Sequence, residues 1–549
     1  MGKTIRLTTA QALIQFLNRQ YIHVDGKEEP FVEGIFTIFG HGNVLGIGQA
    51  LEQDAGHLKV YQGKNEQGMA HAAMAYSKQM LRRKIYAVST SVGPGAANLT
   101  AAAGTALANH IPVLLLPADT FATRQPDPVL QQVEQEYSAA VTTNDALKPV
   151  SRYWDRITRP EQLMSSLIRA FEVMTDPAKA GPATICISQD VEGEAFDFDE
   201  SFFEKRVHYI DRMQPSEREL KGAAERIKES SRPVILVGGG AKYSGAREEL
   251  IALSETYGIP LVETQAGKST VEADFANNLG GMGITGTLAA NKAARQADLI
   301  IGVGTRYTDF ATSSKTAFDF DKAKFLNINV SRMQAYKLDA FQVVADAKVT
   351  LGRLHGLLDG YKSAFGTAIK DWKDEWLAER DRLGKVTFTR DAFKPEIKNH
   401  FSQDVLNEYA DALETELPQT TALLTINDTI PEDSVVISSA GSLPGDLQRL
   451  WHSNVPNTYH LEYGYSCMGY EVSGTLGLKL AHPDKEVYSL VGDGSFLMLH
   501  SELITALQYN KKSMSCSLTT PGSAVSTTCR WITGAAVIFA SSAQRTIRF

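Results

Sequence analysis

The motif Gly492-Asp493-Gly494-Ser495 lies where an apolar run changes into a helical pattern, a position suited to binding chemistry. It follows EVYSLV and precedes FLMLHSELITAL, which predicts a strand, a turn and a helix. A carboxylate at the end of a strand can bind a divalent metal, and flanking glycines let the backbone approach a phosphate. The motif therefore predicts a metal–diphosphate site, and a plain turn without a ligand is the alternative.

A second acidic residue, Glu66, lies in VYQGKNEQGMAHAAMAYSKQ, just after a predicted strand and at the start of an Ala-rich helix. The small side chains of that helix suit close helix packing. A glutamate in a first turn is also favoured by the helix dipole alone, without any catalytic role. Downstream, STSVGPGAANL predicts a strand, a turn at Gly93-Pro94-Gly95 and another small-residue helix.

These motifs belong to three blocks in which short apolar strands alternate with helical patterns. Such alternation is typical of parallel α/β sheets, so we expect three doubly wound domains. The predicted division is a first domain at 1–190, a linker at 191–221, a central domain at 222–361, a connector at 362–399, a third domain at 400–512 that is incomplete, and an aberrant tail at 513–549. The segment at 362–382 is expected to be a solvated helix.

Composition narrows the class of protein. The 549 residues are 43% hydrophobic and 21% charged, with a net charge of −8, which is typical of a globular protein and argues against nucleic-acid or anionic-membrane partners. Residues 1–20 predict an amphipathic helix capped by Thr8 or Thr9 and not a signal peptide. The four cysteines form no CxxC motif, so structural zinc and secreted disulfides are not expected. These features predict a cytoplasmic protein.

Taken in order, Glu66, SVGPGAANL and the late GDGS resemble the thiamine-diphosphate enzymes of the acetolactate synthase and pyruvate oxidase type. The resemblance covers nearly all of residues 1–512. It implies that the first domain binds the aminopyrimidine of the cofactor, that the third binds the diphosphate through Mg²⁺, and that the central domain is a Rossmann-like spacer. It also implies that Glu66 hydrogen-bonds the aminopyrimidine and promotes its imino form, and that Asp493 binds the metal.

The same resemblance assigns further cofactor-binding residues. Met468, in SCMGYE, would support the bent form of the cofactor, although a core methionine is the alternative. Gly441 and Ser442, in Ala-Gly-Ser, resemble the loop that meets the diphosphate. Active sites of the family form between two subunits, which implies a homodimer or homotetramer.

Within the family, four strings resemble the branch that hydrolyses a ring carbon–carbon bond of a cyclic polyhydroxy-dione in myo-inositol catabolism. They are FGHGNVLGIGQAL, KNEQGMAHAAMAYSKQ, FATRQPDPVLQQVEQ and YGYSCMGYEVSGTLGLKLA. His41 and Gln67 are candidate substrate contacts, and a loop histidine without a role is the alternative for His41. A carboligase or decarboxylase of 2-oxo acids and a catalytically inactive homologue are the other readings.

The central block contains glycine clusters that invite a dinucleotide-binding interpretation. After Gly238-Gly239-Gly240, the last glycine of the G-x-G-x-x-G pattern is replaced by Tyr243, and after Gly302-Val303-Gly304 it is replaced by Tyr307. Both clusters lack the glycine that permits close helix–strand packing. We therefore do not expect a nicotinamide cofactor or FAD here, and FAD stays the alternative because some members of the resembled family bind it in this domain.

The tail from Ser513 departs from the family pattern. Its 37 residues contain no Asp, Glu or Lys, and 13 are Ser or Thr. The expected second metal ligand is an Asn near position 520, which is Thr520 here, and the segment SMSCSLTTPGSAVSTTC is not expected to form the buried strand that the alternation requires. One possible back-translation of SMSCSLTTPG, read one base earlier, gives Asn-Val-Leu-Leu-Phe-Asp-Asn-Ser-Gly. We therefore hypothesise a frameshift after Lys512, with a divergent C-terminus as the alternative.

Overall fold

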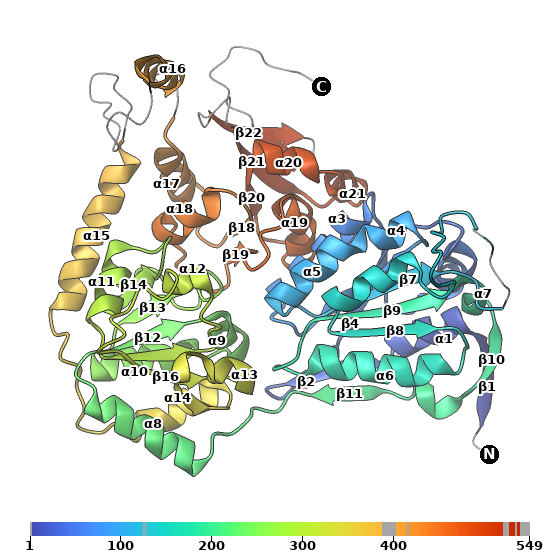
Figure 1. Cartoon of the computed structure of the whole chain (residues 1–549), viewed down its shortest axis with the longest axis horizontal. Coiled ribbons are helices and arrows are strands. Elements are labelled where there is room, and N and C mark those ends of the chain that lie inside the picture. The colour runs from blue at the N-terminus through green and yellow to red at the C-terminus, as the bar shows by residue number, and fades with distance from the viewer. Residues whose placement is uncertain are drawn as a thin grey trace. The chain divides into compact units, whose positions relative to one another are not determined.

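The structure is a computed structural model that describes residues 3–123, 127, 129–386, 402–413, 417–519, 526–532 and 535–538 (Figure 1). The chain divides into two compact units. Unit 1 comprises Met1–Asp211, Gly464–Asp484 and Met498–Lys512, and unit 2 comprises Arg212–Tyr463, Lys485–Leu497 and Ser513–Phe549.

The first sheet, in unit 1, is parallel and has the strand order β5-β4-β6-β7-β9-β8. Its strands are β4 (Val32–Thr37), β5 (Lys59–Gln62), β6 (Ile85–Thr90), β7 (Val113–Asp119), β8 (Tyr153–Ile157) and β9 (Pro182–Ser188). The strand order reverses at β4, which pairs with both β5 and β6. In open α/β sheets, ligands bind at the carboxyl edge beside such a reversal, so this edge is where a site is expected.

The N-terminal segment is a strand followed by a helix, and the helix begins directly after the predicted cap. Residues Thr4–Thr8 form β1, which pairs antiparallel with β10 (Ala195–Asp199), and α1 spans Thr9–Leu17. The predicted cap is confirmed, because the Thr8 hydroxyl accepts a hydrogen bond from the Gln11 amide in a capping box. Strand β10 lies in the segment 191–221, which the sequence presents as a linker. Beyond it, β11 (Arg206–Tyr209) pairs with β2 (Gln20–Val24), and β2 also pairs with β3 (Lys27–Pro30).

Small residues bring two helices of unit 1 into close contact. Helix α3 (Glu66–Gln79) packs against α19 (Tyr470–Ala481). A Cβ atom at Gly477 would lie 2.0 Å from the Ala72 carbonyl oxygen, so only glycine permits this crossing. The expected role of the Ala-rich helix in close packing is therefore confirmed. The other helices of unit 1 include η1 (Val44–Gly48), α2 (Gln49–Gln53), α4 (Pro94–Ala97), α5 (Leu99–Asn109), α6 (Gln162–Thr175) and α7 (Gln189–Glu192).

The central sheet, in unit 2, is also parallel, with the order β14-β13-β12-β15-β16-β17. Its strands are β12 (Pro233–Val237), β13 (Leu261–Glu263), β14 (Asn278–Gly281), β15 (Leu299–Val303), β16 (Lys324–Ile328) and β17 (Phe341–Val343). The helices around it are α8 (Glu217–Glu229), α9 (Gly239–Ser244), α10 (Arg247–Tyr257), α11 (Leu288–Gln296) and α14 (Ala347–His355).

The glycines of the central block have a packing role. The Gly240 amide donates to the Gly304 carbonyl at 2.9 Å, and a Cβ atom on either glycine would overlap the other loop. Tyr307, which replaces the last glycine of the second cluster, is buried, and its hydroxyl donates to Asn327 Oδ1 at 2.6 Å. The close approach of the loops after β12 and β15 therefore gives these glycines a role in packing.

The helix predicted at 362–382 is α15 (Ala368–Gly384). It is not solvated on all sides, because Trp376 is buried in a hydrophobic cluster with residues of the central block. The spacing of Ile369 and Trp376, seven residues apart, places both on one face of the helix, where they are buried.

The third sheet, also in unit 2, has the order β19-β18-β20-β21-β22-β23. Its strands are β18 (Val435–Ser438), β19 (Tyr459–Leu461), β20 (Val487–Gly492), β21 (Ser513–Thr519), β22 (Ser526–Ile532) and β23 (Ala535–Ile538), and the neighbouring helices of unit 2 are α17 (Gln419–Thr429), α18 (Leu443–Leu450) and α20 (Asp493–Met498). Strand β18 pairs with both β19 and β20, so the order reverses there as it does at β4. These three sheets confirm the predicted doubly wound architecture.

One prediction about the tail is wrong. Residues Ser513–Thr519 do form a strand, β21, parallel to β20, with Leu518 opposite Gly492. The open edge of β20 supplies a complete ladder of backbone partners, and this tertiary context overrides the weak strand propensity of the serines. The expected feature, a strand after the helix that ends near Lys512, is therefore present with an unexpected sequence.

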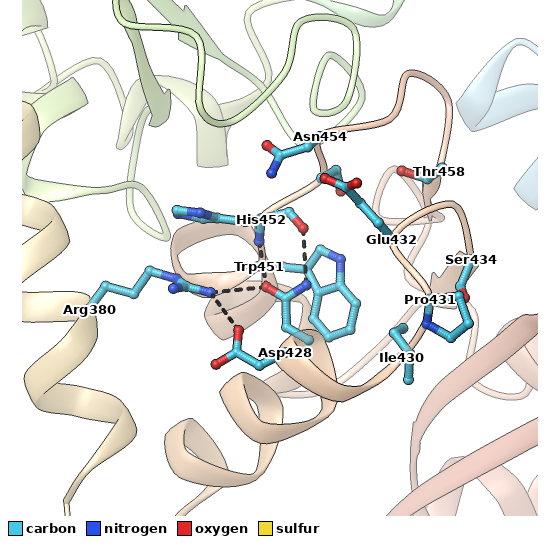
Figure 2. Close-up of a pocket in the computed structure, with 12 residues that line it drawn as sticks. Arg380, Asp428, Ile430, Pro431, Glu432, Ser434, Trp451, His452, Asn454 and Thr458 are labelled. Carbon is cyan, nitrogen blue, oxygen red and sulfur yellow. Dashed lines mark hydrogen bonds and ion pairs between the residues drawn. The ribbon is translucent and has the colours of Figure 1, made fainter.

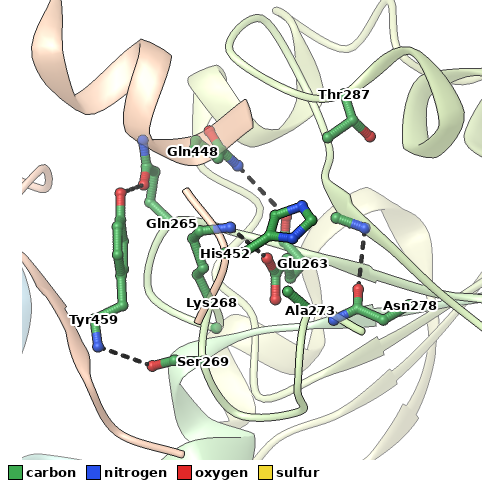
Figure 3. Close-up of polar contacts among 12 residues, drawn as sticks. Glu263, Gln265, Lys268, Ser269, Ala273, Asn278, Thr287, Gln448, His452 and Tyr459 are labelled. Atoms are coloured by element: carbon green, nitrogen blue, oxygen red, sulfur yellow. Dashed lines mark hydrogen bonds and ion pairs between the residues drawn. The ribbon is translucent and has the colours of Figure 1, made fainter. Parts of the chain in front are cut away.

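Polar contacts join the central sheet to the third sheet inside unit 2 (Figure 3). Lys268 and Glu263 form a buried ion pair at 3.2 Å. The Tyr459 hydroxyl donates to Gln265 Oε1 at 3.0 Å, and the Tyr459 amide donates to Ser269 Oγ at 3.2 Å. Because β19 and the loop after β13 are held by these contacts, the central block serves as a support for the third sheet.

Across the described residues, no helix combines the length and the apolar character needed to cross a membrane.

Candidate active site

The local sequence places Glu66 at the first position of α3, at the carboxyl edge of the first sheet. Strand β5 ends at Gln62, and Asn65 caps the helix by accepting the Gly68 amide at 3.1 Å. The helix dipole favours a carboxylate at this end. The predicted placement of Glu66, after a strand and at the start of a helix, is confirmed.

The helical turn after β6, α4 (Pro94–Ala97) with its C-cap Asn98, contacts the Glu66 carboxylate. Asn98 donates from Nδ2 to Glu66 Oε2 at 2.9 Å. A Cβ atom at Gly95 would lie 3.2 Å from the other oxygen, Oε1, so the glycine leaves space beside it. One carboxylate oxygen is therefore held in place while the other faces a backbone without a side chain. This arrangement fits a flat, hydrogen-bonding group such as an aminopyrimidine.

The loop after β4 carries His41 and lies beside the loop after β6, as expected at the reversal of strand order. The Gly42 amide links the two loops by donating to Ser91 Oγ at 3.4 Å, and Asn43 holds the first loop to β6 by donating from Nδ2 to Ser89 Oγ at 3.0 Å. His41 itself is exposed. Its loop is therefore fixed at the same edge of the sheet as Glu66, and the imidazole is open to solvent.

The buried carboxyl group of Glu192 contacts η1 (Val44–Gly48), the helical turn that continues this loop. Its Oε2 accepts the Ile47 amide at 3.0 Å, and Oε1 has no hydrogen-bond partner within the described structure. Burial raises the pKa of Glu192 to about 8, an effect that the hydrogen bond from Ile47 only partly opposes. Sequence reasoning missed this residue, since a single glutamate near the end of a strand carries no distinctive signal.

The remaining candidates of unit 1 are Gln67 and Met468. Gln67 donates from Nε2 to the sulfur of Cys467 at 3.4 Å, so the structure brings Gln67 beside the loop that precedes α19. Met468 lies in that loop and is 41% exposed. The alternative that Met468 is a core methionine is therefore wrong.

In unit 2, the predicted diphosphate-binding residues meet at the reversal of the third sheet. Gly441 and Ser442 follow β18, and Asp493 follows β20, its neighbour. Gly441 has a φ of 81°, and a Cβ atom at Gly494 would meet no other atom within 4 Å. Both loops therefore present open backbone at one edge, which is the arrangement that phosphate binding requires.

Asp493 supplies a single carboxylate to this edge. Its Oδ1 accepts the amide of Gly494 at 2.8 Å, and the side chain is partly exposed. Among the residues that the structure describes, no group of three or more His, Cys, Asp or Glu side chains is arranged to hold a metal. Thr520, at the expected position of the second ligand, lies outside the described residues. The described residues therefore offer one carboxylate to a metal at this edge, and the other ligands would have to come from the diphosphate, water or residues outside the described part.

Strand β21, which borders Asp493, contains buried serines. Ser515 on β21 is 2% exposed and is opposite Ser489 on β20. Neither hydroxyl oxygen has a hydrogen-bond partner in the described structure. An unpaired buried hydroxyl costs about 1–3 kcal/mol, so serine is a poor choice at this position.

The helix predicted after the GDGS motif is broken. It forms α20 and then α21 (Glu502–Gln508). Between the two helices, the Ser473 hydroxyl donates to the Leu499 carbonyl at 3.4 Å, and the Leu503 amide pairs with the His500 carbonyl at 3.1 Å. The break turns Glu502 inward, where it is 1% exposed. Sequence reasoning missed Glu502, and the available signal was an acidic residue in the otherwise apolar ELITAL.

A cavity of about 270 Å³ lies at the opposite, amino edge of the third sheet (Figure 2). It is lined by residues around the start of β18 and the end of α18, including Ser434, Trp451 and His452. The pKa of His452 falls to about 3, mainly because the ring is buried and also because Arg380 and two lysines are near. The cavity contains none of the predicted cofactor-binding residues, and its lining has both acidic and basic groups.

Comparison with known proteins places these features in one family. The chain matches the thiamine pyrophosphate enzyme N-terminal binding domain at residues 27–139, the central domain at 220–354 and the C-terminal binding domain at 439–518. The chain therefore belongs to the thiamine pyrophosphate enzyme family. The predicted domain boundaries stay predictions: the domain at 1–190 contains the first match, whereas the central match begins two residues before the predicted start at 222 and the third match ends six residues after the predicted end at 512.

Relatives within the family are similar over most of their length. The 3D-(3,5/4)-trihydroxycyclohexane-1,2-dione hydrolase of Bacillus velezensis is 99% identical over 512 residues, which are 93% of this chain and 80% of the relative. The enzymes of the same name from Bacillus subtilis and Listeria monocytogenes are 92% and 71% identical over similar lengths. Both Bacillus enzymes match this chain over 512 residues, and 512 residues precede the unusual tail that begins at Ser513.

Proposed function

We propose that this chain is a thiamine-diphosphate-dependent hydrolase that cleaves a ring carbon–carbon bond of 3D-(3,5/4)-trihydroxycyclohexane-1,2-dione. The observation that carries the proposal is the 99% identity to a relative of that name over 512 residues. Both Glu66 and Asp493, the two residues on which the chemistry depends, fall within residues 1–512. The proposed reaction adds water across the broken bond, so the hydroxyl goes to the acyl carbon and a proton goes to the other carbon. The product is an open-chain deoxy-sugar acid, as suits myo-inositol catabolism.

In this proposal, the first sheet provides the acid–base chemistry. Thiamine diphosphate, when bound, supplies a nucleophilic carbon and an electron sink. Glu66 exchanges a proton with the aminopyrimidine through Oε1, the oxygen next to Gly95, while Asn98 holds Oε2. His41 and Gln67 contact the substrate from neighbouring loops. Met468, which is partly exposed, supports the bent form of the cofactor.

The third sheet provides the diphosphate and metal contacts. Gly441, Ser442, Gly492, Gly494 and Ser495 offer backbone and hydroxyl groups to the diphosphate. Asp493 binds Mg²⁺, because a carboxylate oxygen is the ligand this cation prefers. A homodimer or homotetramer in the cytoplasm completes the proposal, with a small polyhydroxy-dione as the substrate.

The proposal is tested by incubating the purified chain with the cyclic dione, thiamine diphosphate and Mg²⁺, and following the product by NMR. We expect a deoxy-sugar acid that forms only when cofactor is present. Turnover of pyruvate in place of the dione would instead indicate a carboligase or decarboxylase and would overturn the proposal.

A second candidate function, an inactive homologue, is favoured by a specific observation. Asp493 has no second carboxylate or amide ligand at Thr520, and the adjoining strand contains the buried hydroxyl of Ser515. If the chain does not bind thiamine diphosphate with Mg²⁺ in a calorimetric titration, this second function is correct for the chain as given.

A further inference from the structure

The segment that carries Glu66 is bound by a buried carboxylate from a distant part of the chain. Glu502, at the start of α21, accepts two successive backbone N–H groups on the same oxygen, Oε1. The Lys64 amide donates to it at 3.0 Å and the Asn65 amide at 2.9 Å. Two successive amides that point at one anionic oxygen form a strong and directional contact. The contact ends one residue before Glu66.

The rest of the Glu502 environment holds its carboxylate in that position. Thr505 donates from Oγ1 to the other oxygen, Oε2, at 2.7 Å. A Cβ atom at Gly68 would lie 2.8 Å from Glu502 Cγ, so α3 approaches the carboxylate closely because residue 68 is glycine. Burial raises the pKa of Glu502, and its hydrogen bonds oppose that effect. Either protonation state keeps Oε1 as an acceptor, so the contact does not depend on ionisation.

The contact bears directly on the candidate catalytic group. The amides of Lys64 and Asn65 lie between the end of β5 and the start of α3, where no strand or helix ladder pairs them. Without Glu502 these amides would lose their acceptor, and the segment would be free to move. Small displacements of a catalytic group lower its rate strongly, because proton transfer needs hydrogen-bond geometry.

We propose that Glu502 is a positioning residue for Glu66: it binds the two amides before Glu66 and thereby fixes the Glu66 carboxylate beside Gly95 and Asn98. The inference rests on the proposed function, since the role of Glu66 belongs to it. Glu502 does not itself contact cofactor or substrate in this proposal.

The test compares Glu502→Ala with Glu502→Gln, and uses Gln508→Ala as the matched control. Gln508 is on the same helix and accepts Lys64 Nζ at 2.7 Å, but it does not touch the two amides. The glutamine variant keeps an oxygen for the amides and gains a donor for Thr505 Oγ1. Two quantities are measured: amide hydrogen exchange of the peptide that contains residues 62–68 in the cofactor-free chain, and deuterium exchange at C2 of thiamine diphosphate bound with Mg²⁺.

We expect Glu502→Ala to speed amide exchange at residues 64 and 65 at least tenfold and to slow C2 exchange at least tenfold. Glu502→Gln and Gln508→Ala should stay within about threefold of the wild-type chain in both measurements. If Glu502→Ala behaves like Gln508→Ala, the inference is wrong. A loss with Glu502→Gln as large as that with Glu502→Ala would also overturn it, because then charge and not amide binding would be the requirement.

A second variant keeps the test decisive if Glu502→Ala does not fold. Gly68→Ala adds a methyl group that displaces the Glu502 carboxylate while alanine suits the helix. It should also slow C2 exchange, and an unchanged rate would contradict the inference. A wild-type chain that exchanges the C2 proton but does not hydrolyse the dione would refute the proposed function and leave the positioning role supported. If the chain binds no cofactor, amide exchange alone decides whether Glu502 holds the segment.

Discussion

The carboxyl edges of the first and third sheets are built on the same plan but differ in how well their polar groups are paired. At the first edge, Asn98 holds Glu66, and the amides before Glu66 bind Glu502. At the third edge, the Asp493 carboxylate accepts the amide of the next residue, and the neighbouring strand contains the unpaired hydroxyl of Ser515.

This difference follows the sequence. The residues that hold the first edge all lie before Lys512, in the part of the chain where 512 residues match a relative at 99% identity. The strand that completes the third edge begins at Ser513. The third sheet therefore keeps the backbone arrangement of that edge, whereas the side chains of β21 do not suit the positions they occupy.

The largest effect is expected from a substitution at the first edge. Glu66→Gln removes the proton-transfer group while keeping the hydrogen bond to Asn98. General acid–base groups contribute roughly 10²–10⁴-fold, so dione hydrolysis and C2 exchange should both fall by that order. Steady-state kinetics and NMR exchange measure them, with Glu52→Gln as an exposed control on α2. Equal rates for the two variants would show that the first edge is not catalytic.

The second-largest expected effect concerns the third edge and the reading frame that encodes its last strands. Resequencing of the source DNA across the Lys512 codon should reveal one inserted or missing base. A chain with the frame restored should bind thiamine diphosphate and Mg²⁺ more tightly than the present chain, because the metal would gain its second ligand; loss of a residue that only orients a ligand already costs about 10–100-fold in metal affinity, so a gain of at least that order is expected. Isothermal titration calorimetry measures this gain, and Asp493→Ala in the restored chain should abolish it. An intact frame in the DNA would leave the divergent C-terminus as the explanation.

The comparison of the two edges also shows what a sequence can predict. Glu66 and Asp493 were placed correctly because each follows a predicted strand and begins a helix, and strand ends in parallel sheets converge at one edge. The sequence left two roles open for Met468, a cofactor contact and a core methionine, because a short motif does not determine how exposed a side chain is. The contacts that position Glu66 come from residue 502, and such long-range pairing leaves no local pattern.

The failure at β21 has a different physical cause. Ser-rich sequence disfavours a buried strand, yet backbone hydrogen bonding to β20 determined the outcome at residues 513–519. Likewise, the break in the helix predicted over residues 496–507 lies where Ser473, on another helix, donates to the Leu499 carbonyl. At both places the contacting partner is distant in sequence.

A pH experiment tests the ionisation of Glu192, the buried carboxyl group at the first edge. The pKa of Glu192 is about 8 in the folded chain and near 4.5 when unfolded, so between these values the folded state holds a proton that the unfolded state has lost. The free energy of unfolding should therefore fall as pH rises through this window, by up to about 1.4 kcal/mol per pH unit from this group. Glu192→Gln should flatten that slope in urea titrations from pH 5 to 8. Parallel slopes for the two chains would show that Glu192 titrates normally.

The smallest effect is expected from a substitution of a buried side chain at the third edge. Ser515→Val removes a buried hydroxyl that has no partner and adds apolar surface beside β20. It should raise the free energy of unfolding by about 1 kcal/mol, measured by urea denaturation. Thr4→Val, a similar change at an exposed position of β1, should alter stability by less than about 0.5 kcal/mol. A destabilised Ser515→Val chain would mean that the Ser515 hydroxyl is satisfied, and the contrast between the two edges would then lie in the metal ligands alone.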